Sequence, residues 1–284
     1  MFEILATKND EGRTLYKLIE KYLNNISKSR IEKIFRKKDV KVNDKRTNDK
    51  SLKIVEGDKI VVYGVFDAQK QEDLPKVQHN ISVIYEDENI LLIDKKQSVV
   101  VHGEDNSLDN QVLSYLKHKK VDSFKPSHVG RLDKETSGLI VYAKNYQTLV
   151  ELNEANNNFV KRYIFKSDID LKPDTKFNMK LYIGKDEKNQ KMRSSLSQQE
   201  NFKEAHTIFF LDGNDKVAEL VTGRKHQIRV TLRHLQKPIY GDRKYGGKKA
   251  ERLMLHSFYL QFNNLKGHLK YLNKKEFWTK KPKW

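Results

Sequence analysis

Cysteine is absent from the 284-residue chain. Its absence excludes disulfide bonds, zinc sites with cysteine ligands and enzymes with a thiolate nucleophile. Among enzymes that modify nucleic acid, it excludes methyltransferases that attack carbon five of a pyrimidine through a cysteine. Any covalent chemistry in this protein must use another nucleophile.

Long hydrophobic runs are also missing. Residues 1–17 contain no apolar stretch of signal-peptide length, and no other segment approaches the roughly 20 apolar residues of a membrane span. The chain contains no internal repeat. We therefore expect a cytoplasmic monomer that has no membrane partner.

Positive charge is abundant. Lysine and arginine together number 56, against 38 aspartate and glutamate, which gives a formal net charge of +18. Such an excess creates a positive surface potential that attracts polyanions, so nucleic acid is the favoured class of partner. The alternative is a lysine-rich surface that is merely well solvated, and charge alone does not decide between the two.

The first 65 residues have the pattern of a small domain. Apolar residues recur at helical spacing in 15–23 and again in 31–35, and Ser27 is a candidate cap for the second helix. A strand at 40–42 is followed by residues that favour a tight turn. Residues 1–65 therefore predict a compact unit of two helices and short strands.

The polar segment 66–80 lacks periodicity and contains a proline, so we predict that it is a linker. The remaining residues, 81–284, contain both helical and strand patterns and have enough apolar content for a core. We predict strands at 83–85, 90–93, 139–143, 162–166, 207–211 and 217–221, and helices at 108–116, 146–154 and 225–236. The polar stretch 185–204 is expected to be a surface excursion. This is the pattern of a mixed α+β domain.

Cationic residues crowd the second predicted helix and the turn after it. They include Lys28, Arg30, Lys33, Arg36, Lys37 and Lys38. Clustered charge of this kind is what phosphate contacts need, and residues 13–63 resemble the αL RNA-binding motif of a small-subunit ribosomal protein and several RNA-modifying enzymes. The resemblance implies recognition of RNA shape and phosphate with little base readout. The alternative is a basic, solvated helix in another kind of small domain.

The segment 128–144 carries the most specific chemical signal. Asp133 is expected in a loop before the strand 139–143, close to Arg131 and followed by a turn that ends at Gly138. A loop carboxylate held by an arginine should stay ionised, which suits a nucleophile or a base. A bare Arg-Leu-Asp triplet, however, is more often an ordinary surface ion pair.

The longer string is more informative. Residues 131–139, Arg-Leu-Asp-x-x-Thr-Ser-Gly-Leu, resemble the catalytic signature of the bacterial large-subunit ribosomal pseudouridine synthase family. Further segments at 161–163, 220–229, 238–246 and 255–256 agree with that family in the same order. With the basic N-terminal unit, the resemblance extends over nearly the whole chain.

The resemblance implies a role for each site residue. It makes Asp133 the catalytic carboxylate, places Tyr163 against the target base and pairs Arg229 with Asp133. Arg229 lies at the border of the apolar face of its predicted helix, where partial burial would let its guanidinium hold the carboxylate with a fork of hydrogen bonds. Arg131 is expected either to contact RNA, filling the gap left by a flipped base, or to anchor the loop.

No cofactor or metal is expected, because making pseudouridine involves neither redox change nor hydrolysis. The nine histidines contain no helical pair of the zinc-protease kind, and we interpret them as packing residues or RNA contacts. The sequence departs from the family pattern at two places. Gly130 stands where many members have histidine, and Lys95-Lys96-Gln97-Ser98 lacks the usual proline and glycine, which puts the geometry of that loop in doubt.

Two other functions remain open at this stage. A non-catalytic RNA-binding factor for ribosome assembly could keep the fold without turnover, although the presence of Asp133, Tyr163 and Arg229 argues against it. A glycosylase would release free base and so change the mass of the RNA. We expect an enzyme that isomerises uridine in structured RNA, most of all in large-subunit ribosomal RNA.

Overall fold

The computed structural model describes residues 1–65 and 77–284, which form two compact units. The first unit contains residues 1–65 together with Leu113–Pro126 and Asn145–Gln147, and the rest of the described chain forms the second. Residues 66–76 of the predicted linker lie outside the described residues. The domain boundaries drawn from the sequence therefore remain a prediction.

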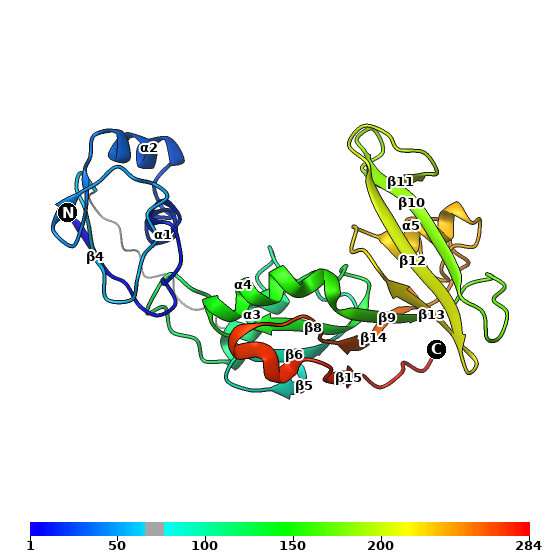
Figure 1. The fold of residues 1–284 in the computed structure, drawn as a ribbon. Coiled ribbons are helices and arrows are strands. Elements are labelled where there is room, and N and C mark those ends of the chain that lie inside the picture. The colour runs from blue at the N-terminus through cyan, green and yellow to red at the C-terminus, as the bar shows by residue number, and fades with distance from the viewer. Residues whose placement is uncertain (66–76) are drawn as a thin grey trace. The chain divides into compact units, whose positions relative to one another are not determined.

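Residues 1–65 combine a small sheet with two helices (Figure 1). The strands are β1 (Phe2–Leu5), β2 (Val40–Val42), β3 (Lys45–Arg46) and β4 (Lys59–Val62), and the helices are α1 (Leu15–Tyr22) and α2 (Lys28–Arg36). The strand order is β1-β4-β2-β3, with antiparallel neighbours. The apolar faces of both helices pack with the sheet in one core. The helices and the strand predicted for this part of the chain are confirmed.

Local chemistry explains where these elements begin and turn. The side chain of Ser27 accepts a hydrogen bond from the backbone amide of Arg30, which caps α2 as expected. Asn43 and Asp44 both have positive φ angles, 46° and 64°, in the two-residue turn between β2 and β3. Two left-handed residues give a hairpin turn whose twist matches that of its strands.

The remaining strands form one mixed, mostly antiparallel sheet. They are β5 (Ser82–Glu86), β6 (Ile90–Lys95), β7 (Ser127–Val129), β8 (Ser137–Ala143), β9 (Val160–Phe165), β10 (Phe177–Asp186), β11 (Lys191–Ser195), β12 (Lys203–Asp212), β13 (Asp215–Leu220), β14 (Leu255–Gln261) and β15 (Glu276–Trp278). Among the residues described, the main order is β11-β10-β12-β13-β9-β14-β8-β6-β5, with β15 beside β14 and β7 beside β8. The β14–β8 pair is parallel. The predicted α+β class is confirmed.

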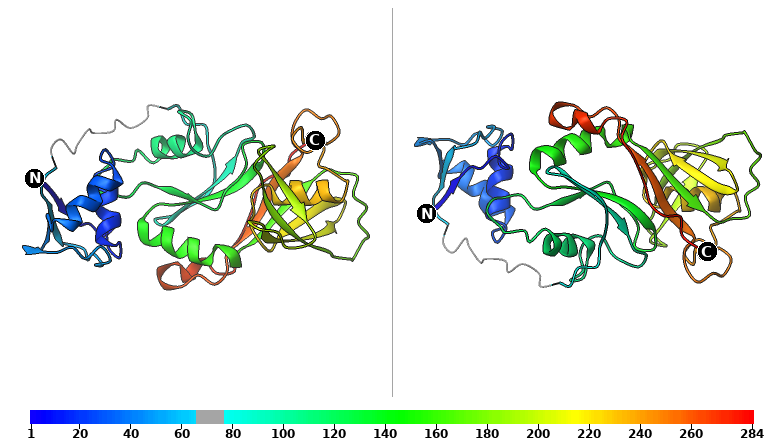
Figure 2. Two further views of the ribbon diagram at one scale, coloured as in Figure 1. Left: turned by 90° about the horizontal axis from the view of Figure 1, so that it is seen from above. Right: turned by 90° about the horizontal axis from the view of Figure 1, so that it is seen from below.

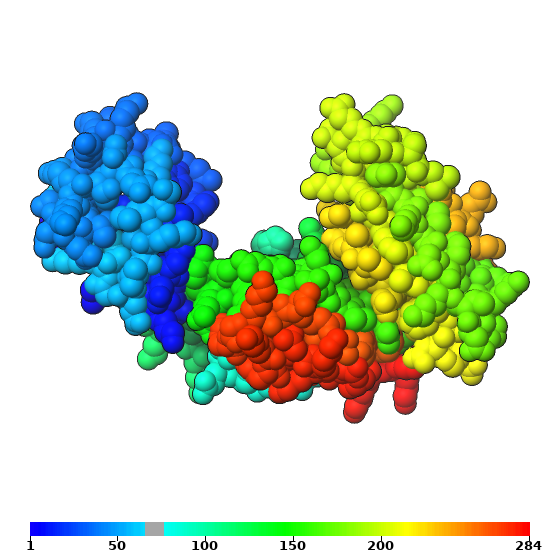
Figure 3. Space-filling view, in the orientation of Figure 1, coloured from blue at the N-terminus to red at the C-terminus, as the bar shows by residue number. Residues whose placement is uncertain are grey.

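The helices outside the first 65 residues are α3 (Leu108–Tyr115), α4 (Tyr146–Ala155) and α5 (Gln227–His234), and 3₁₀-helices span Asn156–Asn158 and Gly267–Leu272. Helix α5 packs against β10, β11 and β12 (Figure 2). The 3₁₀-helix Gly267–Leu272 lies at the surface beside α4 (Figure 3), where His268 pairs with Glu151 at 3.2 Å. No helix in the described ranges is long and apolar enough to cross a membrane.

Several strands were not predicted from the sequence, including β1, β7, β10, β11 and β14. The polar stretch 185–204, expected to be a surface excursion, contains β11, which lies at one edge of the sheet. An edge strand buries little of its surface, so its sequence carries almost no hydrophobic pattern.

Gly138 is required where β8 meets β14. A Cβ atom at this position would lie 2.1 Å from the backbone oxygen of Ser257, its partner in the parallel register, and the φ angle of Gly138 is +113°. Only glycine allows the two backbones to approach this closely. The contact brings β14 beside the residues that follow Asp133.

We predict that Gly138→Ala lowers the free energy of unfolding by about 3 kcal/mol, because the added methyl group forces the two strands apart. Gly213→Ala is the matched control, since Gly213 also has a positive φ but has no neighbour within 4 Å of the added atom. Its expected cost is about 1 kcal/mol, from backbone strain alone. Urea denaturation measures both, and equal losses would contradict the role given to the β8–β14 contact.

Candidate active site

The loop between β7 and β8 carries Asp133. The backbone amide of Thr136 donates a hydrogen bond to the carbonyl oxygen of Asp133 at 3.1 Å, which closes a turn. The buried ammonium of Lys95, at the end of β6, donates to the backbone oxygens of Lys96, Val99 and Lys134 at 2.9 to 3.0 Å. Burial lowers the pKa of Lys95 to about 8. Lys95 therefore fixes the backbone next to Asp133.

Arg229, in the first turns of α5, reaches Asp133. Its Nη1 donates to Oδ2 of Asp133 at 3.1 Å, and the arginine is only 6% exposed. The side chain of Asp133 is 16% exposed, so the pair is shielded from water but still accessible to a substrate. The predicted pairing of these two residues is present in this geometry, but it uses a single hydrogen bond instead of a fork.

The fork of Arg229 is directed at a different carboxylate. Its Nε and Nη2 donate to the two oxygens of Asp242 at 2.8 and 3.0 Å, and Asp242 is 1% exposed. Burial alone would lower the pKa of Arg229, but the hydrogen bonds and charges of Asp242 and Asp133 raise it above its ordinary value. Asp242 thus sets the orientation of the guanidinium, and the third nitrogen of that group, Nη1, is left for Asp133.

His226 forms the other side of the carboxylate. Its Nε2 lies 3.6 Å from Oδ1 of Asp133, and its Nδ1 lies 2.6 Å from the hydroxyl of Tyr245. Burial lowers the pKa of His226 to about 4, so this imidazole is neutral at physiological pH. It therefore adds a polar wall to the site without adding a positive charge.

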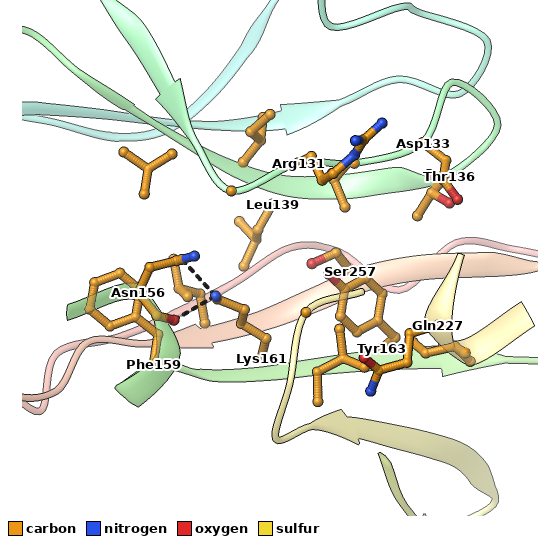
Figure 4. A pocket seen from close by; sticks show the side chains of 18 of the residues that line it. Arg131, Asp133, Thr136, Leu139, Asn156, Phe159, Lys161, Tyr163, Gln227 and Ser257 are labelled. Carbon is orange, nitrogen blue, oxygen red and sulfur yellow. Dashed lines mark hydrogen bonds between the residues drawn. The ribbon is translucent and has the colours of Figure 1, made fainter. Parts of the chain in front are cut away.

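A cavity of about 510 Å³ opens beside Asp133. Figure 4 shows Tyr163 and Lys161 from β9 on one side of it, and Arg131, Asp133 and Leu139 on the other. Tyr163 is buried, which raises the pKa of its hydroxyl to about 12. The cavity has the volume and the aromatic wall that a nucleoside requires.

The Thr-Gly-Arg segment before α5 is held by Gln227. Its side-chain oxygen accepts hydrogen bonds from the hydroxyl of Thr222 at 2.8 Å and from the backbone amide of Arg224 at 2.9 Å. Its nitrogen donates to the backbone oxygen of His206 and the hydroxyl of Thr207, both at 3.0 Å. Gln227 thereby fixes the backbone that leads into His226 and Arg229.

The other predicted site residues are exposed. Arg131 lines the cavity, and no residue in the described part of the chain accepts a hydrogen bond from its guanidinium or pairs with it. The predicted RNA-binding residues belong to the first unit and all are exposed on or just after α2: Lys28, Arg30, Lys33, Arg36, Lys37 and Lys38. Two of them have partners, since Lys28 pairs with Glu20 and Arg30 donates to the backbone oxygen of Gly64.

The sequence predicted no role in the site for Asp242 or Lys95, and His226 was interpreted, with the other histidines, as a packing residue or an RNA contact. All three lie within or beside segments that match the family pattern, and this match is the feature of the sequence that could have identified them as site residues. The departure at 95–98 has a structural counterpart, because Ser98 adopts a φ of 62°, a conformation that glycine adopts more easily. Where the structure describes the chain, no three histidine, aspartate or glutamate side chains converge as metal ligands would.

Comparisons with known proteins agree on one family. A family model described as RNA pseudouridylate synthase matches residues 89–234. An uncharacterized RNA pseudouridine synthase of Mycoplasma capricolum subsp. capricolum is 34% identical over 299 residues, which cover 100% of this chain and 99% of that protein. Ribosomal large subunit pseudouridine synthase C of Rickettsia felis is 34% identical over 276 residues, 87% of each chain. The structure of human RNA pseudouridylate synthase domain containing 1 is similar in fold, with a TM-score of 0.54 and 24% identity over 65% of this chain and 79% of that one.

We predict that Asp242→Asn both destabilises the protein and impairs turnover, because it leaves the buried Arg229 with one carboxylate in place of two. The expected loss in the free energy of unfolding is about 3 kcal/mol. Asp168→Asn is the control, since it breaks an ion pair with Lys248 at the surface and should cost far less. Urea denaturation and a turnover assay on both variants test this. Full activity and stability in Asp242→Asn would refute the proposed support of Asp133.

Proposed function

Because the chain belongs to the RNA pseudouridylate synthase family and is an RNA pseudouridine synthase, we propose that it isomerises specific uridines of large-subunit ribosomal RNA and that Asp133 carries the chemistry. The family predicted from the sequence is confirmed. The proposal that the substrate is large-subunit ribosomal RNA is supported by relatives named ribosomal large subunit pseudouridine synthase. The observation that most favours Asp133 is its shielded contact with Arg229 at the edge of a nucleoside-sized cavity.

The reaction breaks the bond between uracil N1 and ribose C1′, turns the base and forms a bond from C5 to C1′. A proton leaves C5 and N1 gains one, so the mass of the RNA is unchanged. Asp133 can serve as a nucleophile towards the ribose or the base, or as a base that removes a proton from the sugar. In each case an ionised carboxylate is needed, and Nη1 of Arg229 donates a hydrogen bond to one of its oxygens.

The uridine must leave its stack in the RNA to reach Asp133, which costs a few kcal/mol. We propose that the ring of Tyr163 offsets part of this cost by contact with the face of the base. Arg131 lines the same cavity and has no partner in the described residues, so its guanidinium is available to contact the RNA near the flipped nucleotide. This favours the RNA contact over a loop anchor for Arg131.

The basic face of α2 is proposed to bind the phosphates of the structured RNA. Its cations are exposed and lie in a capped helix and the turn after it, in a unit with a core of its own. Contacts of this type add affinity and register without sequence preference, while the cavity selects the nucleotide.

Asp133→Asn is predicted to abolish pseudouridine formation in transcribed large-subunit ribosomal RNA and to leave RNA affinity within about twofold. The amide keeps the size of the side chain but removes its charge. A gel-shift titration and mass spectrometry of the RNA provide the two readouts. Strong loss of binding with residual activity would overturn the role of Asp133, and release of free uracil would indicate a glycosylase.

The substrate is identified by mapping pseudouridines in total RNA from cells that carry the wild-type gene, lack it, or carry Asp133→Asn. We expect particular positions of large-subunit ribosomal RNA to lose the modification in both altered strains. If the lost positions lie in another RNA, the substrate assignment is wrong although the activity stands.

The triple variant Lys33→Gln, Arg36→Gln and Lys37→Gln is predicted to weaken RNA binding and to flatten its salt dependence. The slope of log affinity against log salt should fall by about 2, since each lost phosphate contact removes roughly 0.7 to 0.9. The matched control replaces Lys117, Lys119 and Lys120, three exposed lysines of the same unit, by glutamine. Equal effects of the two triple variants would mean that only total charge matters, not the face of α2.

A further inference from the structure

Lys161 is an ammonium group in the catalytic cavity without a counter-ion. Its Nζ donates hydrogen bonds to the backbone oxygen and the side-chain Oδ1 of Asn156 at 2.8 and 2.7 Å, as Figure 4 shows. In the described ranges, no carboxylate pairs with it, and the nearest ring is that of Phe159, 5.5 Å away. The positive charge is therefore balanced only by amide dipoles.

Such a charge is unfavourable for stability. Burial lowers the pKa of Lys161 to about 8, which leaves most of the population protonated at neutral pH. An apolar side chain of similar size would avoid this cost. An ammonium has three donors and Asn156 accepts from two of them, so one donor remains for a ligand in the cavity.

The position of Lys161 on β9 defines what it can reach. It lies two residues before Tyr163, so both side chains project from the same face of the strand, about 6.6 Å apart along it. Both line the cavity that Asp133 borders. A pyrimidine ring that rests on Tyr163 would therefore have one edge within hydrogen-bonding reach of Lys161.

We propose that Lys161 is a second catalytic residue, which donates a hydrogen bond to a carbonyl oxygen of the target uracil and stabilises the negative charge that the base acquires. When the N1–C1′ bond breaks, its electron pair stays with the uracil and is delocalised onto the ring oxygens. The charge disappears when C5 bonds to C1′ and the C5 proton is lost while N1 is protonated. This inference rests on the proposed binding of a flipped uridine in the cavity.

A phosphate group is the weaker candidate for the ligand of Lys161. The cavity also exposes cations that suit phosphate, namely Arg131 and Lys225, which are accessible from solvent. Lys161 instead is half-buried, among the apolar side chains of Phe159 and Leu139. A charge in such an environment acts most strongly on charge that develops there during the reaction.

The test compares Lys161→Met with Lys166→Met, which removes an exposed lysine that directly follows the same strand. In single-turnover reactions on transcribed large-subunit ribosomal RNA, Lys161→Met should be about 10- to 100-fold slower, with RNA affinity and its salt dependence unchanged. Lys166→Met should match the wild type. The wild-type rate should also fall as the pH rises through about 8, where Lys161 loses its proton, and this fall should be absent in Lys161→Met.

Substrates with sulfur in place of one uracil oxygen give an independent measurement. At the mapped uridine, 2-thiouridine or 4-thiouridine should slow the wild type, because sulfur is a weaker acceptor, and the same substitution should cause no further loss in Lys161→Met. If Lys161→Met fails to fold, the rates of the wild type on the thio substrates and on the normal substrate provide the test. Equal rates on all of them would refute the proposal. Weaker binding with a lower salt slope and a normal rate would mean a phosphate contact, which also refutes it. If Lys161→Met loses activity while Asp133→Asn keeps full activity, the proposed role of Asp133 is wrong, but the proposed role of Lys161 stands.

Discussion

The site depends on a buried guanidinium that two carboxylates share. Arg229 is nearly inaccessible to water, so its charge can remain in the protein only because Asp242 supplies two hydrogen bonds and Asp133 a third. These residues come from α5, from the loop after it and from the loop between β7 and β8. A shift of any one segment removes at least one hydrogen bond from this buried charge, which makes the geometry of the site a condition of its stability.

The same loops are also held by contacts with backbone atoms, which are not ion pairs. Lys95 binds three backbone oxygens around the loop that carries Asp133, and Gly138 lets β14 pack against the end of that loop. Gln227 fixes the residues before α5 in a similar way. Asp133 is therefore positioned by its neighbours before any RNA is present, so in the proposed reaction the energy of RNA binding can be used to extract the uridine.

The parts of the fold and the site that could be predicted from the sequence are those with a local sequence pattern or a motif shared with a family. The helices of the first unit were predictable because apolar periodicity, a serine cap and a turn sequence agree over short distances. Asp133 and Arg229 were found through an ordered set of motifs, and their contact follows from it. The fork between Arg229 and Asp242 was missed because Asp242 lies in a loop without periodicity, and its place in the matched segment 238–246 does not reveal that its carboxylate is buried or which residue it contacts. The edge strand β11 was missed because Met192 is its only apolar residue, which is too little to show a strand pattern.

Under the proposed roles of Asp133 and Lys161, charge within the site is separated in the direction that the reaction needs. The cluster of Asp133, Asp242 and Arg229 carries one net negative charge at one wall of the cavity, and neutral His226 adds none. The exposed Arg131 of the same wall is proposed to contact the RNA, which would neutralise its charge. Lys161 supplies a positive charge on the other side of the cavity. Breaking a carbon–nitrogen bond with both electrons on the base makes the sugar electron-poor and the uracil electron-rich. A neutral uridine gains little from this field before the bond breaks and much more while it breaks, so the field acts on the transition state in preference to the bound substrate.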